Sequence, residues 1–306
     1  MNPGTASNLS VWQIWLLAAR PRTLPAAAAP VLVGCGVAVW EGVFRPLPAL
    51  AAFLVGLLLQ IGANISNDYF DFKKGADTSE RIGPLRVTQA GLLTPRQVIG
   101  GMLVVFGAAA LIGLYLIWVA GLPALILGVV AILSALAYTG GPYPLAYHGW
   151  GEVFVLLFFG FAAVGGTYFV QAGSVSAAAL VSSLPVGLLA MAILTVNNLR
   201  DIATDRASGK HTLAVRLGEQ GAVIEYGVWV GLAYGVALMG VISRILPVAA
   251  LLSLLSLPLA ARLIRQVAHT RGRALNALLG KTGQLELLFA VLFTGGLLIS
   301  RWWSGF

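Results

Sequence analysis

Apolar stretches of about 20 residues recur along almost the whole chain, and they leave few folds open to it. A helix of about 20 residues crosses the roughly 30 Å of hydrocarbon in a bilayer. Hydrophobic residues make up 58% of the 306 residues and charged residues only 10%, so the apolar surface exceeds what one water-soluble core can hold. The stretches do not alternate polar and apolar residues, as the strands of a membrane β-barrel do. The sequence therefore predicts an all-α protein embedded in a membrane.

Nine membrane-spanning helices are predicted, in a single domain that covers residues 1–306. Residues 1–23 are expected to form a cytoplasmic or interfacial N-terminal segment, because VWQIWLLAARPR combines Trp and Arg residues suited to the headgroup region. Inside the first span, GCG at 34–36 is expected to allow close helix packing. We place the spans at 24–41, 47–66, 97–119, 122–140, 152–172, 177–197, 220–242, 245–264 and 283–300.

The 19 Lys and Arg residues divide unequally between the two ends of these spans. Only Arg45, Arg244 and Arg301 fall on the side opposite the N-terminus. The positive-inside rule therefore places the N-terminus in the cytoplasm and the C-terminus outside. This topology and contact with lipid headgroups explain the net charge of +8, so we do not expect nucleic acid as a partner.

All five Asp residues of the chain lie in two motifs, NDYFDFKKGAD at 67–77 and NNLRDIATD at 197–205. On the predicted topology the motifs stand at the cytoplasmic ends of the second and sixth spans. An Asp near the centre of a span costs about 2.5 to 3.5 kcal/mol on insertion scales, so carboxylates gathered at span ends indicate a functional site. For Asp68 alone, a solvated loop charge is an equally good interpretation.

The spacing inside the motifs gathers their polar groups on helix faces. Asn67 and Asp71 are four residues apart, which puts them on one face of a helix. The same spacing separates Asn197 from Asp201 and Asp201 from Asp205. Carboxylate and amide oxygens suit Mg²⁺, which usually bridges one or two carboxylates to substrate phosphates. The motifs therefore predict Mg²⁺ and a phosphorylated substrate.

Basic residues adjoin both motifs and are able to hold phosphate oxygens directly. Taken singly, each is better explained as a charge that sets the topology. The candidate phosphate-binding residues are Lys73, Lys74, Arg81 and Arg86 after the first motif, and Arg200 and Lys210 at the second.

The chain resembles the UbiA superfamily of intramembrane aromatic prenyltransferases over nearly its whole length, in the strings NDYFDFKKGADT, YTGGPYPLAYHGWGE and NLRDIATDRASGKHTLAVRLG. Within that superfamily it is most similar to the 1,4-dihydroxy-2-naphthoate prenyltransferases of menaquinone and phylloquinone synthesis. The resemblance implies nine spans, Mg²⁺ as cofactor, and a polyprenyl diphosphate and 1,4-dihydroxy-2-naphthoate as substrates. With the predicted topology, it implies a bacterial cell (inner) membrane enzyme whose active site faces the cytoplasm, or an enzyme of a photosynthetic membrane if the donor is phytyl diphosphate.

The resemblance also implies roles for individual residues. Asp71 and Asp201 are expected to be indispensable for catalysis. Tyr138 would stabilise an allylic carbocation with its ring face, and Arg22 would meet the acceptor carboxylate. An interfacial aromatic residue and a topology charge are the respective alternatives. The implied metal ligands are Asn67, Asp68, Asp71, Asp77, Asn197, Asp201 and Asp205.

Two positions depart from the family pattern. Asp77 follows Asp71 by six residues instead of the more common four, and Pro142 stands where many relatives have a Lys. Other aromatic acceptors, such as 4-hydroxybenzoate or homogentisate, stay open, and so does a secondary transporter, which also uses intramembrane carboxylates. The sequence sets neither the chain length of the donor nor the oligomeric state.

Overall fold

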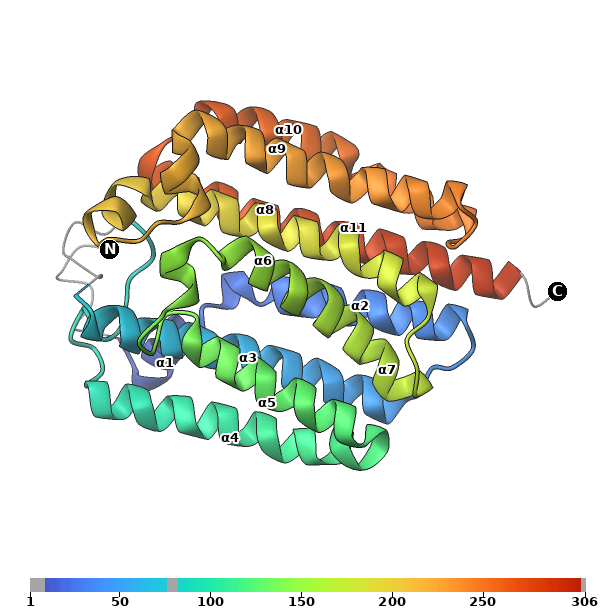
Figure 1. The fold of residues 1–306 in the computed structure, drawn as a ribbon, viewed down its shortest axis with the longest axis horizontal. Helices are drawn as coiled ribbons and strands as arrows, with labels where there is room; N and C mark the ends of the chain where they lie inside the picture. The colour runs from blue at the N-terminus through green and yellow to red at the C-terminus, as the bar shows by residue number, and fades with distance from the viewer. Residues whose placement is uncertain (1–8, 76–81, 304–306) are drawn as a thin grey trace.

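The computed structural model describes residues 9–75 and 82–303, which form a bundle of helices that run roughly side by side (Figure 1). Asp77 and Arg81 lie outside these residues. The π-helical segment η4 (Leu156–Gly165) joins α6 to α7, and the 3₁₀ segment η5 (Val248–Ser256) precedes α10. The helices are α1 (Val11–Ala19), α2 (Pro25–Trp40), α3 (Pro46–Lys73), α4 (Pro95–Ala120), α5 (Leu122–Ala137), α6 (Gly151–Val155), α7 (Gly166–Ala172), α8 (Ala177–Ala207), α9 (Leu213–Ile242), α10 (Leu257–His269) and α11 (Leu275–Trp303).

Seven helical stretches in the described part of the chain are long and apolar enough to cross a membrane. The segments Val11–Thr23 and Pro25–Trp40 meet this test only as a pair, bent by 54°. With 16 residues, α5 measures about 24 Å, which is short against roughly 30 Å of hydrocarbon. Each predicted span coincides with a helix or a continuous helical stretch, but the count of nine is not confirmed. The seven are α3, α4, Gly151–Ala172, α8, α9, Val248–His269 and Gly272–Trp303.

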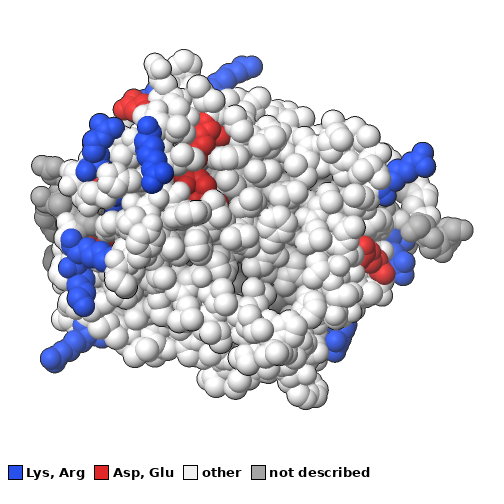
Figure 2. Space-filling model, in the orientation of Figure 1, with Lys and Arg blue, Asp and Glu red and all other residues white. Residues whose placement is uncertain are grey.

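Charged side chains gather toward the two ends of the bundle, and a broad uncharged surface separates them (Figure 2). Large apolar residues are exposed on this surface, among them Leu103, Leu111 and Trp118 of α4, with Trp118 exposed by 82%. In water such a face would be unfavourable, whereas lipid tails solvate it. The charge pattern and the helix lengths together identify a multi-pass membrane protein.

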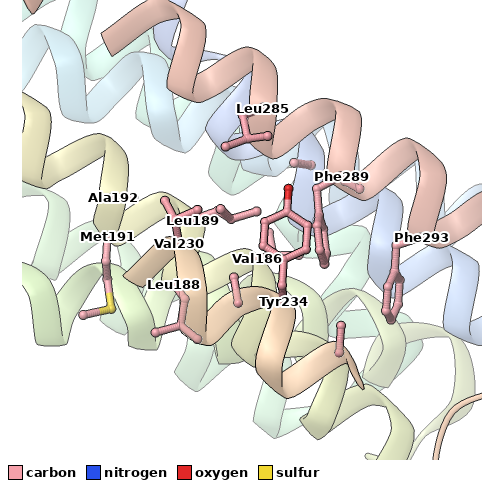
Figure 3. Packing of buried hydrophobic residues seen from close by; sticks show 14 of the residues in the cluster. Val186, Leu188, Leu189, Met191, Ala192, Val230, Tyr234, Leu285, Phe289 and Phe293 are labelled. Carbon is pink, nitrogen blue, oxygen red and sulfur yellow. The ribbon is translucent and has the colours of Figure 1, made fainter. Parts of the chain in front are cut away.

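The core lies between α8, α9 and α11 (Figure 3). The rings of Tyr234 and Phe289 meet edge to face, with their centroids 5.4 Å apart. The Tyr234 hydroxyl shares a hydrogen bond of 2.6 Å with the Ser256 hydroxyl, so its polar end is satisfied inside the bundle. These contacts join α9, α11 and η5 in the same core cluster as buried residues of α8, the helix that carries the second Asp-rich motif.

Glycines in α2 let this helix approach two others closely. A Cβ atom on Gly34 would lie 2.6 Å from the carbonyl oxygen of Val164, and one on Gly36 would lie 2.8 Å from Cγ2 of Thr294. Any larger residue would force α2 away from η4 or α11. The expectation of close helix packing at GCG is confirmed.

The first part of one Asp-rich motif and the whole of the other lie near the C-terminal ends of long helices. Residues 67–73 end α3, and residues 197–205 lie near the end of α8. Beyond these ends, Gly75 and Gly209 adopt φ angles of 68° and 73°, which glycine tolerates best. The helical spacing predicted within each motif is therefore present.

Candidate active site at the ends of α3 and α8

The ends of α3 and α8 bring the two motifs together at one end of the bundle (Figure 1). Lys210, just beyond α8, lies between them. Its Nζ is 3.3 Å from Oδ1 of Asp71 and 3.9 Å from Oδ1 of Asp205. Both Asp residues are buried, so one ammonium group bridges carboxylates from two helices in a place with little water.

Asp71 also accepts hydrogen bonds from two other side chains. Arg86 donates from Nη2 to Oδ2 at 2.9 Å, and the Tyr147 hydroxyl donates to Oδ1 at 3.3 Å. Arg86 is buried like Asp71, so this ion pair is largely desolvated. Because breaking a buried pair leaves an uncompensated charge, these contacts hold Asp71 firmly.

Asp68 faces a different set of donors. Its Oδ2 accepts from the backbone N–H of Val87, and its Oδ1 accepts from the backbone N–H and the hydroxyl of Thr88. Asp68 is 1% exposed. These bonds occupy both oxygens, so in this structure Asp68 anchors the segment around residue 87 to α3. Its predicted role as a metal ligand stays a prediction.

Asn67 and Lys74 are tied to the segment that follows α5. The Thr139 hydroxyl donates to Oδ1 of Asn67 at 2.8 Å. Lys74 donates from Nζ to the carbonyl oxygens of Thr139 and Gly141, at 2.8 and 3.3 Å. Partial burial lowers the pKa of the Lys74 ammonium, which Asp71 opposes. Two side chains of the first motif therefore position the turn at residues 138–142.

Tyr138 caps the C-terminal end of α5 and stands close to both motifs. Its hydroxyl is 3.1 Å from the place that a Cβ atom on Gly151 would occupy. Burial raises the pKa of the Tyr138 phenol, and the negative charges of Glu152, Asp205 and Asp71 raise it further. The phenol is therefore protonated at neutral pH and is available as a hydrogen-bond donor.

The aromatic ring of Tyr147 supports the two lysines of the site. Lys74 Nζ lies 4.9 Å and Lys210 Nζ lies 4.7 Å from the ring centroid, within the range of cation–π contacts. The backbone N–H of His211 donates to the carbonyl oxygen of Tyr147 at 2.8 Å. The loop before α6 and the loop after α8 are thus joined over the site.

In the second motif, Arg200 organises the other polar groups. Its Nε and Nη2 hold both oxygens of Asp201, at 2.8 and 2.5 Å. Nη2 also donates to Oδ1 of Asn197 at 2.8 Å, and Nη1 donates to Oδ1 of Asn276 at 2.7 Å. A planar guanidinium fits this set of acceptors, which a lysine ammonium does not reproduce. Arg200 therefore orders the motif from within.

Two further predicted residues, Lys73 and Arg22, make none of these contacts in the part of the chain that the structure describes. Lys73 and Arg22 are exposed, and within residues 9–75 and 82–303 the structure shows no polar side-chain contact from either to the two motifs. Asp77 and Arg81 cannot be placed, because they lie outside the described residues. The predicted roles of these four residues stay predictions.

Three residues at the site were not predicted from the sequence. Thr139 and Tyr147 lie in the string YTGGPYPLAYHGWGE, which carries the family resemblance, so a signal for them was present. Asn276, which accepts from Arg200, also donates to the carbonyl oxygen of Ile82 at 3.0 Å. A single Asn at the start of α11 has no pattern that reveals this role.

Whether Mg²⁺ fits this site depends on which oxygen ligands lie close together. In the described part of the chain, no three His, Cys, Asp or Glu side chains form a group able to hold a metal ion. Lys210 instead stands between Asp71 and Asp205, as a compact cation between hard oxygen donors from two helices. Mg²⁺ needs only one or two carboxylates when water and phosphate oxygens complete its coordination, so the donors fit this ion.

A membrane bundle with acidic motifs facing each other across one end defines the class of protein. Residues 27–281 match the UbiA prenyltransferase family, and the chain belongs to this family, as the motifs predict. Family membership favours an enzyme over the transporter alternative. The 1,4-dihydroxy-2-naphthoate octaprenyltransferase of Escherichia coli is 39% identical over 306 residues, covering 97% of this chain and 99% of the relative. The enzyme of that name from Mycobacterium tuberculosis is also 39% identical, covering 92% and 96%.

Solved structures show the same fold. A UbiA homologue from Archaeoglobus fulgidus bound to GPP and Mg²⁺ gives a TM-score of 0.66 at 13% identity, over 94% of this chain and 99% of that one. An apo UbiA homologue from Aeropyrum pernix gives 0.64 at 18% identity, over 95% and 98%. At such low identity, these likenesses concern the fold alone.

Proposed function

We propose that the chain transfers a polyprenyl group from a prenyl diphosphate to 1,4-dihydroxy-2-naphthoate, with release of pyrophosphate and CO₂, in menaquinone or phylloquinone synthesis. The similarity to enzymes of this name over nearly the full length of both chains supports the acceptor. The single observation that carries the chemistry is the bridge from Lys210 to Asp71 and Asp205, since it marks one small volume where both motifs can share a cation.

The motif side chains would hold Mg²⁺ through Asp71, Asp201 and Asp205, with Asn67 and Asn197 beside them. When bound, the metal supplies positive charge that stabilises the departing diphosphate. Asp68 and Asp77 complete the proposed ligand set, although the hydrogen bonds of Asp68 favour an anchoring role.

In this proposal, basic residues of the site release the motif carboxylates and bind the diphosphate of the substrate. Lys74, Arg86 and Lys210 stand at the first motif, and they can hold diphosphate oxygens once the metal takes over the carboxylates. Arg200 keeps the second motif in place throughout. The exposed residues Lys73 and Arg22 and the undescribed Arg81 would meet anionic groups of the substrates from the rim.

The chemical step breaks the bond between the prenyl C1 atom and a diphosphate oxygen and forms a carbon–carbon bond to the naphthoate ring. The ring carboxylate leaves as CO₂, so its electron pair is returned to the ring. Tyr138, protonated and close to both motifs, would stabilise positive charge on the allylic carbons with its ring face.

The location of the site suits substrates of mixed character. The isoprenoid tail is most stable in hydrocarbon, while the diphosphate needs the aqueous edge. The motif end of the bundle is where these media meet. The excess of Lys and Arg at this end supports placing it on the cytoplasmic side of the cell membrane.

A direct assay tests the proposal. Purified protein in detergent receives 1,4-dihydroxy-2-naphthoate, prenyl diphosphates of several lengths, and either Mg²⁺ or a chelator. We expect the prenylated naphthoquinol, pyrophosphate and CO₂ in equal amounts, only with the metal. The same assay with 4-hydroxybenzoate or homogentisate tests the other acceptors, and lack of product with the naphthoate and every donor overturns the proposal.

A further inference from the structure

Glu152, at the start of α6, carries a buried carboxyl group that takes no part in the proposed chemistry. Its side chain is 5% exposed. Oε1 accepts a hydrogen bond from Asn198 Nδ2 at 3.1 Å. Oε2 is buried and has no hydrogen-bond partner among the described residues. Because a buried carboxyl oxygen without a donor is unfavourable, Oε2 is suited to a donor that comes with a ligand.

Glu152 adjoins both the cation-stabilising tyrosine and the second motif. The Tyr138 hydroxyl lies against Gly151, the residue before Glu152. The negative charge of Glu152 is among those that raise the pKa of the Tyr138 phenol, after the effect of burial. Asn198, which holds Oε1, directly follows Asn197 in the chain. The Glu152 carboxyl group is therefore carried by the residue next to the one that the Tyr138 hydroxyl contacts, and it is held by a residue of the second motif.

The proposed acceptor carries two hydroxyl groups with different needs. Its 1-hydroxyl adjoins the 2-carboxylate and can donate a hydrogen bond to it within the same molecule. The 4-hydroxyl has no such neighbour, so it needs an acceptor from the protein once it leaves water. A contact at this hydroxyl also fixes which ring carbon faces the prenyl chain.

We propose that Oε2 of Glu152 accepts a hydrogen bond from the 4-hydroxyl of the aromatic acceptor, while Asn198 keeps the carboxyl group from turning away. The proposal rests on the function proposed above and names the group that selects its acceptor. Glu152 is then a substrate-binding residue. A phenol without the 4-hydroxyl leaves a buried oxygen unpaired, which is how binding sites discriminate strongly against a missing polar group.

Glu225 on α9 provides a matched control. Its Oε1 accepts from the Thr195 hydroxyl at 3.1 Å and from Trp229 Nε1 at 3.0 Å. Its Oε2 is also buried with no hydrogen-bond partner in the described part of the chain, and the side chain is 6% exposed. Glu225 is not among the carboxylates that act on Tyr138. Glu225 is near enough for its charge to act on Glu152, but Glu225→Gln leaves Oε2 of Glu152 and its partner Asn198 unchanged. This variant therefore tests whether a neighbouring carboxyl alone sets the preference between acceptors.

The test compares the binding of two acceptors that differ by the 4-hydroxyl. Dissociation constants for 1,4-dihydroxy-2-naphthoate and 1-hydroxy-2-naphthoate are measured without oxygen, with Mg²⁺ and an unreactive prenyl thiodiphosphate present. In the unmodified protein we expect the dihydroxy compound to bind about tenfold more tightly, the effect of one buried hydrogen bond. In Glu152→Gln, which still accepts from Asn198, the amide nitrogen can only donate to the 4-hydroxyl oxygen in place of the bond to a carboxylate. We therefore expect the ratio to fall to about threefold. Glu225→Gln should keep the original ratio.

A retained tenfold ratio in Glu152→Gln overturns the inference, and so does an equal loss in Glu225→Gln. Binding of the thiodiphosphate shows that each variant is folded. If Glu152→Gln does not fold, Glu152→Asp withdraws the carboxyl group by one methylene, and a ratio that stays at its original value there also contradicts the contact. Absence of prenylated naphthoquinol in the unmodified protein is a separate result, which overturns the proposed function itself.

Discussion

The two helices that carry the Asp-rich motifs hold their carboxylates in different ways. In the most apolar part of α8, 67% of the residues are buried inside the bundle, whereas the share in α3 is 22%. On α8, Asp201 is held by Arg200 of the same helix. On α3, Asp71 is held by Arg86 and Lys210 from segments that follow the helices. The second motif is therefore set by its own helix, and the first by the loops that pack on it.

Removing one carboxylate charge from each motif should have the largest effect. Asp71→Asn and Asp201→Asn are both expected to reduce turnover by more than about 100-fold. Even the loss of a residue that only supports a metal ligand typically lowers metal affinity or activity about 10- to 100-fold. Stability should separate them. Asp201→Asn leaves the buried Arg200 without its counterion inside a helix and should lower the melting temperature in detergent. Asp71→Asn also takes a carboxylate from a buried guanidinium, that of Arg86, but Arg86 lies in a loop that can move toward water, and Lys210 keeps Asp205 as a counterion. We therefore expect a smaller loss for Asp71→Asn.

Prenyl-transfer rates and thermal unfolding of the same preparations check this pair. Near-normal turnover in either variant removes that Asp from the catalytic site. Equal losses of stability would contradict the distinction between a motif set by its helix and one set by loops.

Replacing the arginines by lysine should have the next largest effect. Arg200→Lys keeps the charge but loses the planar arrangement that holds Asp201, Asn197 and Asn276. We expect Mg²⁺ affinity to fall about 10- to 100-fold, as for other groups that orient metal ligands. Arg86→Lys should cost less, since a loop ammonium can still reach Asp71. Mg²⁺ titrations of turnover measure both, and a larger loss in Arg86→Lys would reverse the comparison.

Releasing the loop from α3 tests how the first motif is supported. Thr88→Val removes the hydroxyl that donates to Asp68 and keeps the shape of the side chain. The buried carboxylate then lacks one donor, which typically costs about 1–3 kcal/mol. We expect a lower unfolding free energy and faster proteolysis near residues 82–88, measured by urea titration and limited digestion. Unchanged digestion would show that Asp68 does not anchor this segment.

The two adjacent lysines at the end of α3 should give the smallest effects. Lys74→Gln loses donation to the carbonyl oxygens of Thr139 and Gly141, and we expect the KM for prenyl diphosphate to rise about fivefold, near 1 kcal/mol. Lys73→Gln, at an exposed position, should stay within about twofold. Steady-state kinetics at fixed Mg²⁺ distinguish them, and an equal rise in both would assign Lys73 to diphosphate binding.

The fold was largely predictable, because apolar length and charge at the ends of each stretch are written in the sequence. Each predicted span coincides with a helix or a continuous helical stretch, and the close packing at Gly34 and Gly36 was expected. Two features of the fold could not be predicted from the sequence. The 16-residue length of α5 and the π-helical turns of η4 depend on packing with neighbouring helices, which hydropathy does not report.

Within the candidate site, the helical spacing placed Asn67 and Asp71 on one helix and Asn197, Asp201 and Asp205 on another. The partners of these residues were harder to foresee. Asn276 reaches Arg200 only because α11 packs beside α8, 76 positions away in the sequence. The donors to Asp68 come from backbone groups, which every residue carries and no sequence pattern marks.

Neutralisation of the motif carboxylates by Lys210, Arg86 and Arg200 bears on how the protein is made. A site crowded with unpaired negative charge would have to wait for a divalent ion before its helices could close. Here the chain brings its own counterions, so we expect membrane insertion and folding to proceed without magnesium. A chelator should then stop prenyl transfer reversibly and leave the protein folded, as expected of a metal that binds with the substrate and is not part of the scaffold.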